Sequence, residues 1–155
     1  MDSQFKHMIH LLLFVMVYVS CQSERQLVWE ENFDGNSLNE EHWSFELGDG
    51  CPNLCGWGNN ELQLYTKKNH EVRDGLLTIT SKLENGKYTS TRITTKNKQE
   101  FQYGKMEMKA KLPIGKGLWP AFWMLGSNRD EVGWPLCGGI DILEYVGREP
   151  ETIFT

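Results

Sequence analysis

The chain has 155 residues, a length that allows a single domain. Hydrophobic residues make up 39% of the chain and charged residues 24%, a globular composition that excludes a low-complexity or collagen-like protein. The formal net charge is −5 and no run of Lys and Arg is present. This balance argues against nucleic acid as a partner, because phosphate binding needs a basic surface.

The first 21 residues predict export. Lys6 precedes an apolar stretch over residues 9–19, interrupted only by His10, which has the shape of a signal peptide and is too short for a stable membrane span. Val19-Ser20-Cys21 is similar to a lipoprotein cleavage box, although Tyr18 departs from the Leu usual there. Two outcomes stay open: a secreted or periplasmic protein, or a protein anchored at the cell envelope by lipid on Cys21. Residues 22–155 are then the folded domain.

Four cysteines are present, and an exported protein can oxidise them: Cys21, Cys51, Cys55 and Cys137. Cys51 and Cys55 flank a three-residue loop that a disulfide could pin, which requires Cα atoms within about 7 Å of each other. A CxxxC pair could also hold a metal ion. No His or second Cys pair lies at ligand spacing, and this argues against zinc.

The remaining chain alternates between apolar and polar residues in short segments, which predicts strands. The Asn85-Gly86 pair between two such segments indicates a tight hairpin. Expected strands, in chain order, are residues 62–66, 76–83, 88–95, 105–112, 118–125 and 140–146, of which 105–112 has the clearest alternation. No window of eleven residues has a convincing helical period. We therefore expect an all-β sandwich or barrel of antiparallel strands with little helix.

The segment Gly138-Gly139-Ile140-Asp141-Ile142-Leu143-Glu144-Tyr145 carries most of the chemical information. In a regular strand Gly139 and Asp141 share a face and Glu144 points away. A β-bulge between Asp141 and Glu144 would turn Glu144 back to that face. Retaining glycosidases need two carboxylates about 5–5.5 Å apart, and positions 139 and 144 across a bulge meet that requirement.

This segment resembles the active-site strand of glycoside hydrolase family 16, the laminarinase-like retaining endo-β-glucanases, whose pattern reads Glu-x-Asp-x-x-Glu. Three further motifs agree with the resemblance and occur in family order: residues 56–63 (GWGNNELQ), 118–125 (LWPAFWML) and 133–135 (GWP). The similarity runs from about Leu27 to Thr155. The extra residue before Glu144 is typical of the β-1,3-glucanase branch.

The resemblance implies a jelly-roll β-sandwich with a sugar cleft, acting as a monomer on a β-glucan polysaccharide or oligosaccharide. Glu144 matches the general acid/base and Asp141 the assisting carboxylate, which would hydrogen-bond and tune its neighbours. The matching sugar contacts are Trp119, Trp123, Trp134, Asn60 and Arg92. No cofactor is implied, although a structural calcium ion could be bound. Core packing for each Trp, and a surface salt bridge for Arg92, stay open as alternatives, while Glu61 and Gln63 are expected to shape their strand.

Two departures from the family pattern limit what the resemblance implies. Gly139 stands where the family places its nucleophilic Glu, and losing a nucleophile lowers turnover by roughly 10⁴-fold or more. The chain also ends at Thr155, where family members continue with strands that complete both sheets. We therefore expect a jelly-roll that is incomplete at its C-terminus, with exposed sheet edges and apolar faces.

Two functional hypotheses follow. The first is a retaining endo-β-1,3-glucanase that is impaired at Gly139. The second is a non-catalytic β-glucan-binding or recognition module that keeps the cleft without the nucleophile. The retained Glu144 and Asp141 favour the first, since a long-lived binding module has little reason to keep an acid/base pair. A single-base difference between Glu and Gly codons is a third explanation for residue 139.

Overall fold

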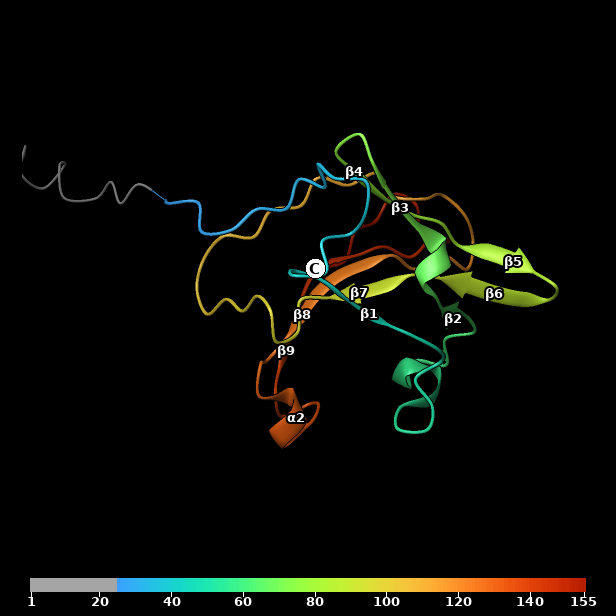
Figure 1. The fold of residues 1–155 in the computed structure, drawn as a ribbon. Coiled ribbons are helices and arrows are strands. Elements are labelled where there is room, and N and C mark those ends of the chain that lie inside the picture. Colours follow the sequence, from blue (N-terminus) through green and yellow to red (C-terminus); the bar gives the residue numbers. More distant parts are fainter. Residues whose placement is uncertain (1–24) are drawn as a thin grey trace, which may run out of the picture. The chain divides into compact units, whose positions relative to one another are not determined.

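The computed structural model describes residues 25–155 (Figure 1). The chain divides into two units, one ending at Asn32 and one spanning Phe33–Thr155. Residues 25–32 of the first unit form no regular secondary structure. The predicted leader, Cys21 included, lies outside the described residues. Within residues 25–155, no helix is both long enough and apolar enough to cross a membrane.

The regular secondary structure of the second unit consists mostly of short strands, which confirms the all-β prediction. Its elements are β1 (Ser44–Glu46), η1 (Cys55–Gly58), β2 (Leu64–Tyr65), η2 (Lys67–Asn69), β3 (His70–Arg73), β4 (Leu76–Ile79), β5 (Lys82–Glu84), β6 (Lys87–Ser90), β7 (Arg92–Thr94), β8 (Ala121–Leu125), α2 (Arg129–Val132) and β9 (Gly139–Glu144). Antiparallel pairs form between β1 and β7, β3 and β4, and β8 and β9. A three-stranded sheet has the order β2-β6-β5, in which β2 runs parallel to β6.

The hairpin predicted at Asn85-Gly86 is confirmed. β5 and β6 pair in antiparallel register with Glu84 opposite Lys87, so a two-residue turn joins them. Both turn residues have positive φ, 51° at Asn85 and 74° at Gly86. This backbone suits a tight hairpin, and Asn and Gly are the residues that adopt it most readily.

The strand predicted over residues 76–83 is instead split into β4 and β5. Asn69, which is buried, lies at the break. Its carbonyl accepts a hydrogen bond from Thr80 N (2.8 Å), and its side-chain amide donates to Thr80 O (2.9 Å). Because Asn69 takes both backbone groups of Thr80, the chain changes pairing partner there, from β3 to β6.

The strand predicted over residues 105–112 is wrong. Within the described residues, no strand is assigned between Thr94 and Ala121. Met106 and Leu112 are half-buried as the alternation predicts, but Met108 is exposed. Alternation of apolar and polar residues defines the two faces of an extended segment. A strand also needs a second segment with which its backbone forms hydrogen bonds, and the alternation does not predict which segment that is.

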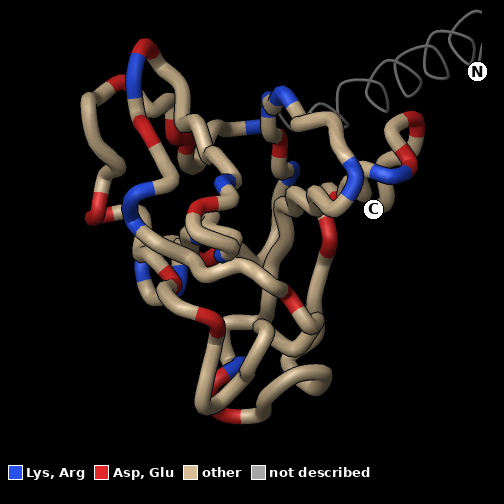
Figure 2. The backbone as a smooth tube through the Cα atoms, turned by 90° about the vertical axis from the view of Figure 1, so that its right-hand side faces the viewer, with Lys and Arg blue, Asp and Glu red and all other residues tan. Residues whose placement is uncertain are grey.

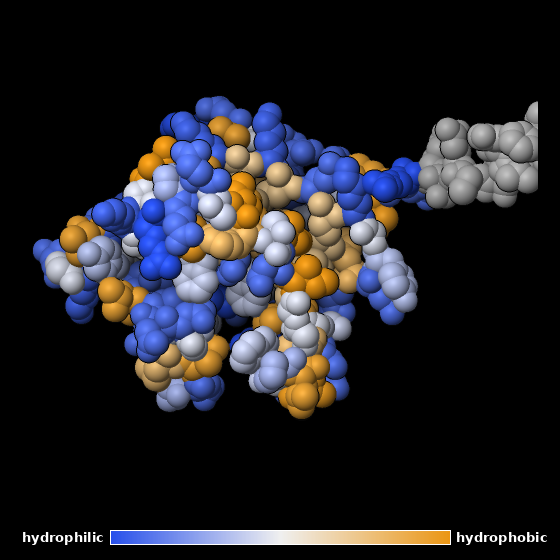
Figure 3. Space-filling view, turned by 180° about the vertical axis from the view of Figure 1, so that it is seen from behind, coloured by the Kyte–Doolittle hydropathy of each residue, from blue (hydrophilic) through white to orange (hydrophobic). Residues whose placement is uncertain are grey.

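Burial in the second unit is sparse. The buried large apolar residues are Leu38, Val72 and Tyr145, while many others are exposed. Seen from behind, apolar surface is distributed over the molecule in several patches (Figure 3). Charged residues of both signs are spread over the backbone (Figure 2), but every charged residue between positions 26 and 66 is acidic, and Lys and Arg predominate over residues 92–116.

Candidate functional site

The hairpin of β8 and β9 carries the acidic residues predicted from sequence. Its register pairs Trp123 with Asp141, then Phe122 with Leu143 and Ala121 with Glu144. Ile142 has no opposite residue in this ladder, and a register shift lies between Phe122 and Trp123. This is the expected β-bulge, confirmed at Ile142. Because opposite residues project from the same face, Glu144 and Asp141 both lie on the face of Trp123.

Gly139 lies on this face as well. It pairs with Leu125, two residues along β8 from Trp123. A Cβ atom added to Gly139 would meet Leu125 Cδ2 and Met124 O at 3.6 Å, which is ordinary van der Waals contact. Gly138, by contrast, has a φ of +72°, a conformation that favours glycine. Neither the backbone nor the neighbouring atoms therefore require glycine at position 139.

Two backbone hydrogen bonds hold Glu144 in β9, both to Phe154 on the edge away from β8. On the edge toward β8 it lies opposite Ala121. On the other edge Glu144 N donates to Phe154 O (2.8 Å) and Phe154 N donates to Glu144 O (2.9 Å). The Glu144 side chain is half-buried and Asp141 is exposed. Within residues 25–155 neither carboxylate forms an ion pair.

The three predicted sugar platforms all retain exposed ring surface. The exposed fraction is 48% for Trp119, 38% for Trp123 and 73% for Trp134. The β8–β9 ladder continues past Ala121 through two backbone hydrogen bonds, from Tyr145 N to Pro120 O and from Gly147 N to Leu118 O. Trp119 therefore shares the face of Trp123. Trp134 lies in the α2 connection between β8 and β9.

Arg92 occupies a different position from an ordinary surface arginine. Its Nε donates to Glu46 Oε2, and the two side chains are only 16% and 23% exposed. Its guanidinium carbon lies 4.4 Å from the centroid of Trp57, 5.1 Å from that of Trp123 and 5.9 Å from that of Tyr65. The salt bridge considered from sequence is present, but it is half-buried and surrounded by aromatic rings.

A hydrogen-bonded group lies beside this cluster. Glu61 Oε2 accepts from Tyr65 Oη (2.6 Å) and from Gln63 Nε2 (2.7 Å), and Gln63 also donates to Tyr65 Oη (2.8 Å). Burial first, and then the hydrogen bond to Glu61, raise the pKa of Tyr65 to about 12. Asn60, the predicted polar sugar contact, precedes this group and is exposed, with a φ of +57°.

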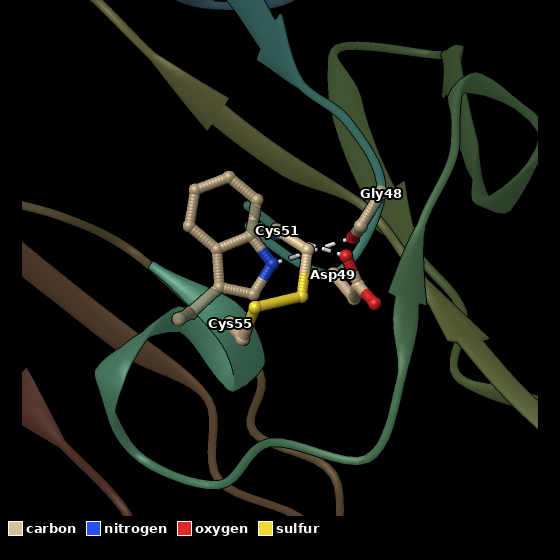
Figure 4. Close-up of a disulfide and its surroundings, with 5 residues drawn as sticks. Gly48, Asp49, Cys51 and Cys55 are labelled. Atoms are coloured by element: carbon tan, nitrogen blue, oxygen red, sulfur yellow. Dashed lines mark hydrogen bonds between the residues drawn. A yellow bond between two sulfur atoms is a disulfide. The ribbon is translucent and has the colours of Figure 1, made fainter. Parts of the chain in front are cut away.

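The loop before η1 is closed by a disulfide between Cys51 and Cys55, a pairing that the sequence allowed but left open (Figure 4). Their Cα atoms lie 4.2 Å apart. Cys51 N donates to Asp49 Oδ1 (2.9 Å), and Trp57 Nε1 donates to Gly48 O (3.3 Å). The disulfide loop is thereby tied to the segment that supports Trp57. Cys137 is a free thiol.

Sequence reasoning missed three residues of the Arg92 cluster: Glu46, Trp57 and Tyr65. Trp57 and Tyr65 lie in or next to a motif that was recognised, so their aromatic character was a usable signal. Glu46 pairs with Arg92 across β1 and β7, 46 residues away in the chain. No local pattern predicts that pairing.

Within the part of the chain that the structure describes, no three His, Cys, Asp or Glu side chains are grouped so that they could hold a metal ion. Calcium prefers several carboxylate and carbonyl oxygens. No such set of acidic side chains fits the calcium ion that the resemblance allowed, and we assign no residues to one.

Comparison with known proteins identifies relatives for most of the chain. A sequence profile described as "Glycosyl hydrolases family 16" matches residues 58–155. A laminarinase from Flavobacterium sp. UMI-01 is 66% identical, with a TM-score of 0.80 over 83% of this chain and 55% of that chain. A glucan endo-1,3-beta-glucosidase of Cryptopygus antarcticus is 45% identical over 138 residues, 82% of this chain.

A beta-1,3-glucan-binding protein of Penaeus monodon is 48% identical over 61 residues, 39% of this chain and 17% of its own length. The chain spans 48% of the length of the Cryptopygus glucosidase and so about half of that relative.

Proposed function

The chain belongs to glycosyl hydrolase family 16, and we propose that it binds β-1,3-glucan on the open face of β8–β9 but hydrolyses it poorly. The observation that carries the proposal is the bulged register of β9. It brings Glu144, Asp141 and position 139 to one face, the face of an exposed tryptophan. The missing element is the side chain at Gly139.

Family membership also identifies the fold. The short antiparallel pairs and the near absence of helix belong to a jelly-roll β-sandwich, the architecture of the laminarinases that this chain superposes on. In this architecture the β8–β9 face is one part of a curved sheet. The proposed glucan would lie across that face.

In the proposed chemistry Glu144 protonates the glycosidic oxygen as the leaving group departs. Asp141, opposite Trp123, assists by hydrogen bonding to its neighbours. A retaining mechanism then needs a carboxylate to attack the anomeric carbon and form a glycosyl-enzyme intermediate. Gly139 offers no atom for that step. Two carboxylates and water suffice for the full reaction, so it requires no cofactor.

The proposed sugar contacts are the exposed rings of Trp119, Trp123 and Trp134, together with Asn60. Flat indole faces pack against the apolar faces of sugar rings, and two of these rings share the face of Glu144. Arg92, the remaining predicted contact, forms an ion pair with Glu46, and its guanidinium carbon lies 5.1 Å from the centroid of the Trp123 ring.

The second candidate function is glucan recognition without catalysis. The glycine at position 139 favours it, and so does the shrimp relative described as a beta-1,3-glucan-binding protein. Both candidates predict binding by the natural chain. They differ in what happens when the missing carboxylate is supplied.

Gly139→Glu is the experiment that separates them. Because a Cβ fits at position 139 without strain, we expect the variant to fold and to gain laminarin hydrolysis by about 10⁴-fold over the parent, measured as reducing ends. The matched control is Ile140→Glu, which places the new carboxylate next along the strand on the opposite face. A folded Gly139→Glu protein that binds laminarin without hydrolysing it would favour the recognition module.

We also propose that the protein is exported and acts as a monomer on extracellular or envelope-associated glucan. The apolar segment before Ser20-Cys21 supports export, and a lipid on Cys21 would attach the protein to the membrane. Mass spectrometry of the mature protein should find an N-terminus at or just before Cys21, with or without an acyl mass. An exported product that retains residues 1–20 would contradict the proposal.

A further inference from the structure

We propose that Arg92 is a positioning residue of the glucan-binding face. Held by Glu46, its guanidinium group orients the indole of Trp123 and so sets affinity for the sugar. The inference rests on the proposed function and deepens it. In this proposal Arg92 does not contact the sugar directly, as the family resemblance implied, but acts on it through Trp123.

The first step is how Arg92 is held. Arg92 and Glu46 are directly opposite in the antiparallel register of β1 and β7, so their side chains leave the sheet on the same face. Nε of Arg92 donates to the carboxylate, and both side chains are largely shielded from water. An ion pair so shielded is less screened than an exposed one. The bond to Nε also fixes the plane of the guanidinium group.

The second step is what the guanidinium group touches. Both Trp57 and Trp123 lie within the range of about 6 Å over which a cation interacts with an aromatic ring. Two further contacts hold Trp57. Its indole N–H donates a hydrogen bond to Gly48 O, and its ring meets that of Tyr65 edge-on, with the ring centroids 5.7 Å apart. Arg92 therefore has one well-anchored ring beside it.

The third step is the connection to the site. Trp123 belongs to β8, and β8–β9 and β1–β7 are separate sheets without hydrogen bonds between their strands. The Arg92–Trp123 contact thus links the carboxylate-bearing hairpin to the rest of the domain. Trp123 is 38% exposed, so part of its ring stays available while Arg92 holds another part. A ring ordered before binding loses less conformational freedom when the sugar arrives.

The test is a double-mutant cycle on binding of a β-1,3-linked glucose hexamer, measured by calorimetry. Arg92→Met keeps much of the side-chain volume and should raise the Kd about 5- to 10-fold, the size of a partly desolvated cation–π contact. Trp123→Ala should weaken binding as well. If Arg92 acts through Trp123, Arg92→Met should cause no further loss in the Trp123→Ala background.

The matched control is Arg73→Met. Arg73 also pairs with a carboxylate, Glu71, but it is well exposed and lies on the β3–β4 hairpin. Its replacement should leave the Kd unchanged. If Arg92→Met fails to fold, Arg92→Lys and Glu46→Gln replace it in the cycle. The first keeps the charge without the planar group and the second removes the anchor.

A readout without ligand addresses positioning itself. Near-ultraviolet circular dichroism reports how rigidly the indoles are held, and the Trp123 contribution is the difference between the parent and Trp123→Phe. Arg92→Met should shrink that contribution, and Arg92→Lys should restore part of it. An unchanged tryptophan signal in a folded Arg92→Met protein would overturn the proposal.

The outcomes separate the two levels of inference. Equal losses from Arg92→Met in both backgrounds would mean that Arg92 contacts the sugar directly, which overturns the positioning role and leaves the proposed function intact. No measurable binding by the parent would overturn the proposed function, while the circular dichroism difference would still decide whether Arg92 positions Trp123.

Discussion

At the residue scale, the proposed site on β9 would differ from a complete pair of retaining carboxylates by one side chain. Glu144 and Asp141 are on the open face, and position 139 is two residues before Asp141 on the same strand. The surrounding atoms leave room for a Cβ there, and the backbone does not call for glycine. The proposed loss at this position therefore concerns the side chain alone, and the architecture around it would accept a carboxylate.

Tyr65 gives a pH prediction at the same scale. Its pKa is raised from 10.0 to about 12, by burial first and then by Glu61. A folded-state pKa above the unfolded value stabilises the fold below the unfolded pKa, and that contribution is lost as pH rises through the folded pKa. The free energy of unfolding should therefore fall between pH 10 and about 12.

Absorbance at 295 nm during an alkaline titration measures this ionisation. The difference between the parent and Tyr65→Phe should contain a tyrosinate step near pH 12, and Glu61→Gln should move that step to lower pH. A Tyr65 step centred at pH 10 in the folded protein would show that neither burial nor Glu61 raises the pKa of this phenol.

At the element scale, the bulge in β9 brings Asp141 and Glu144 to the same face although two residues separate them. A regular strand would reach the same arrangement with one residue between the two carboxylates. Ile142 is the extra residue, and the pairs on either side of it are those of an uninterrupted ladder. Removing Ile142 would leave Asp141 opposite Trp123 and Glu144 opposite Ala121. Adding a residue there would push Glu144 toward the other face, because side chains alternate along a strand.

Deletion and insertion at Ile142 test this reading in the Gly139→Glu protein. Deletion should keep laminarin hydrolysis within about tenfold, whereas insertion of Ala after Ile142 should lower it by roughly 10²-fold or more, the contribution of a general acid. Circular dichroism and thermal unfolding confirm folding of both. Equal losses of hydrolysis from the deletion and the insertion would mean that activity requires the bulge itself and does not depend only on the face to which Glu144 points.

Elements differ in how far sequence predicts them. The Asn85-Gly86 hairpin and the bulge in β9 could be predicted because local backbone chemistry and residue count determine them. The break at Thr80 and the missing strand over residues 105–112 could not, since both depend on which distant backbone groups are available as partners. The candidate carboxylates were predicted from a motif. The anchor Glu46 was not, because its relation to Arg92 exists only in the folded register.

At the scale of the whole molecule, the described domain combines short sheets with a large exposed apolar surface. Few large apolar residues are buried, and several are exposed in loops, including Leu62, Ile114 and Leu136. The sequence carries a net charge of −5, and every charged residue between positions 26 and 66 is acidic. This surface suits an uncharged polymer such as β-glucan better than a polyanion.

The central claim is that the natural chain keeps an acid/base and a sugar site but has lost its nucleophile at Gly139. Anion rescue tests it directly. With an activated aryl β-glucoside oligomer, added azide should attack the anomeric carbon from the space that the absent side chain leaves, and aryloxide should depart. We expect negligible turnover without azide, and azide-dependent release of the aryl group with an α-configured glycosyl azide identified by NMR. Hydrolysis with retained configuration in the absence of any added anion would contradict the claim, because another residue would then be acting as nucleophile.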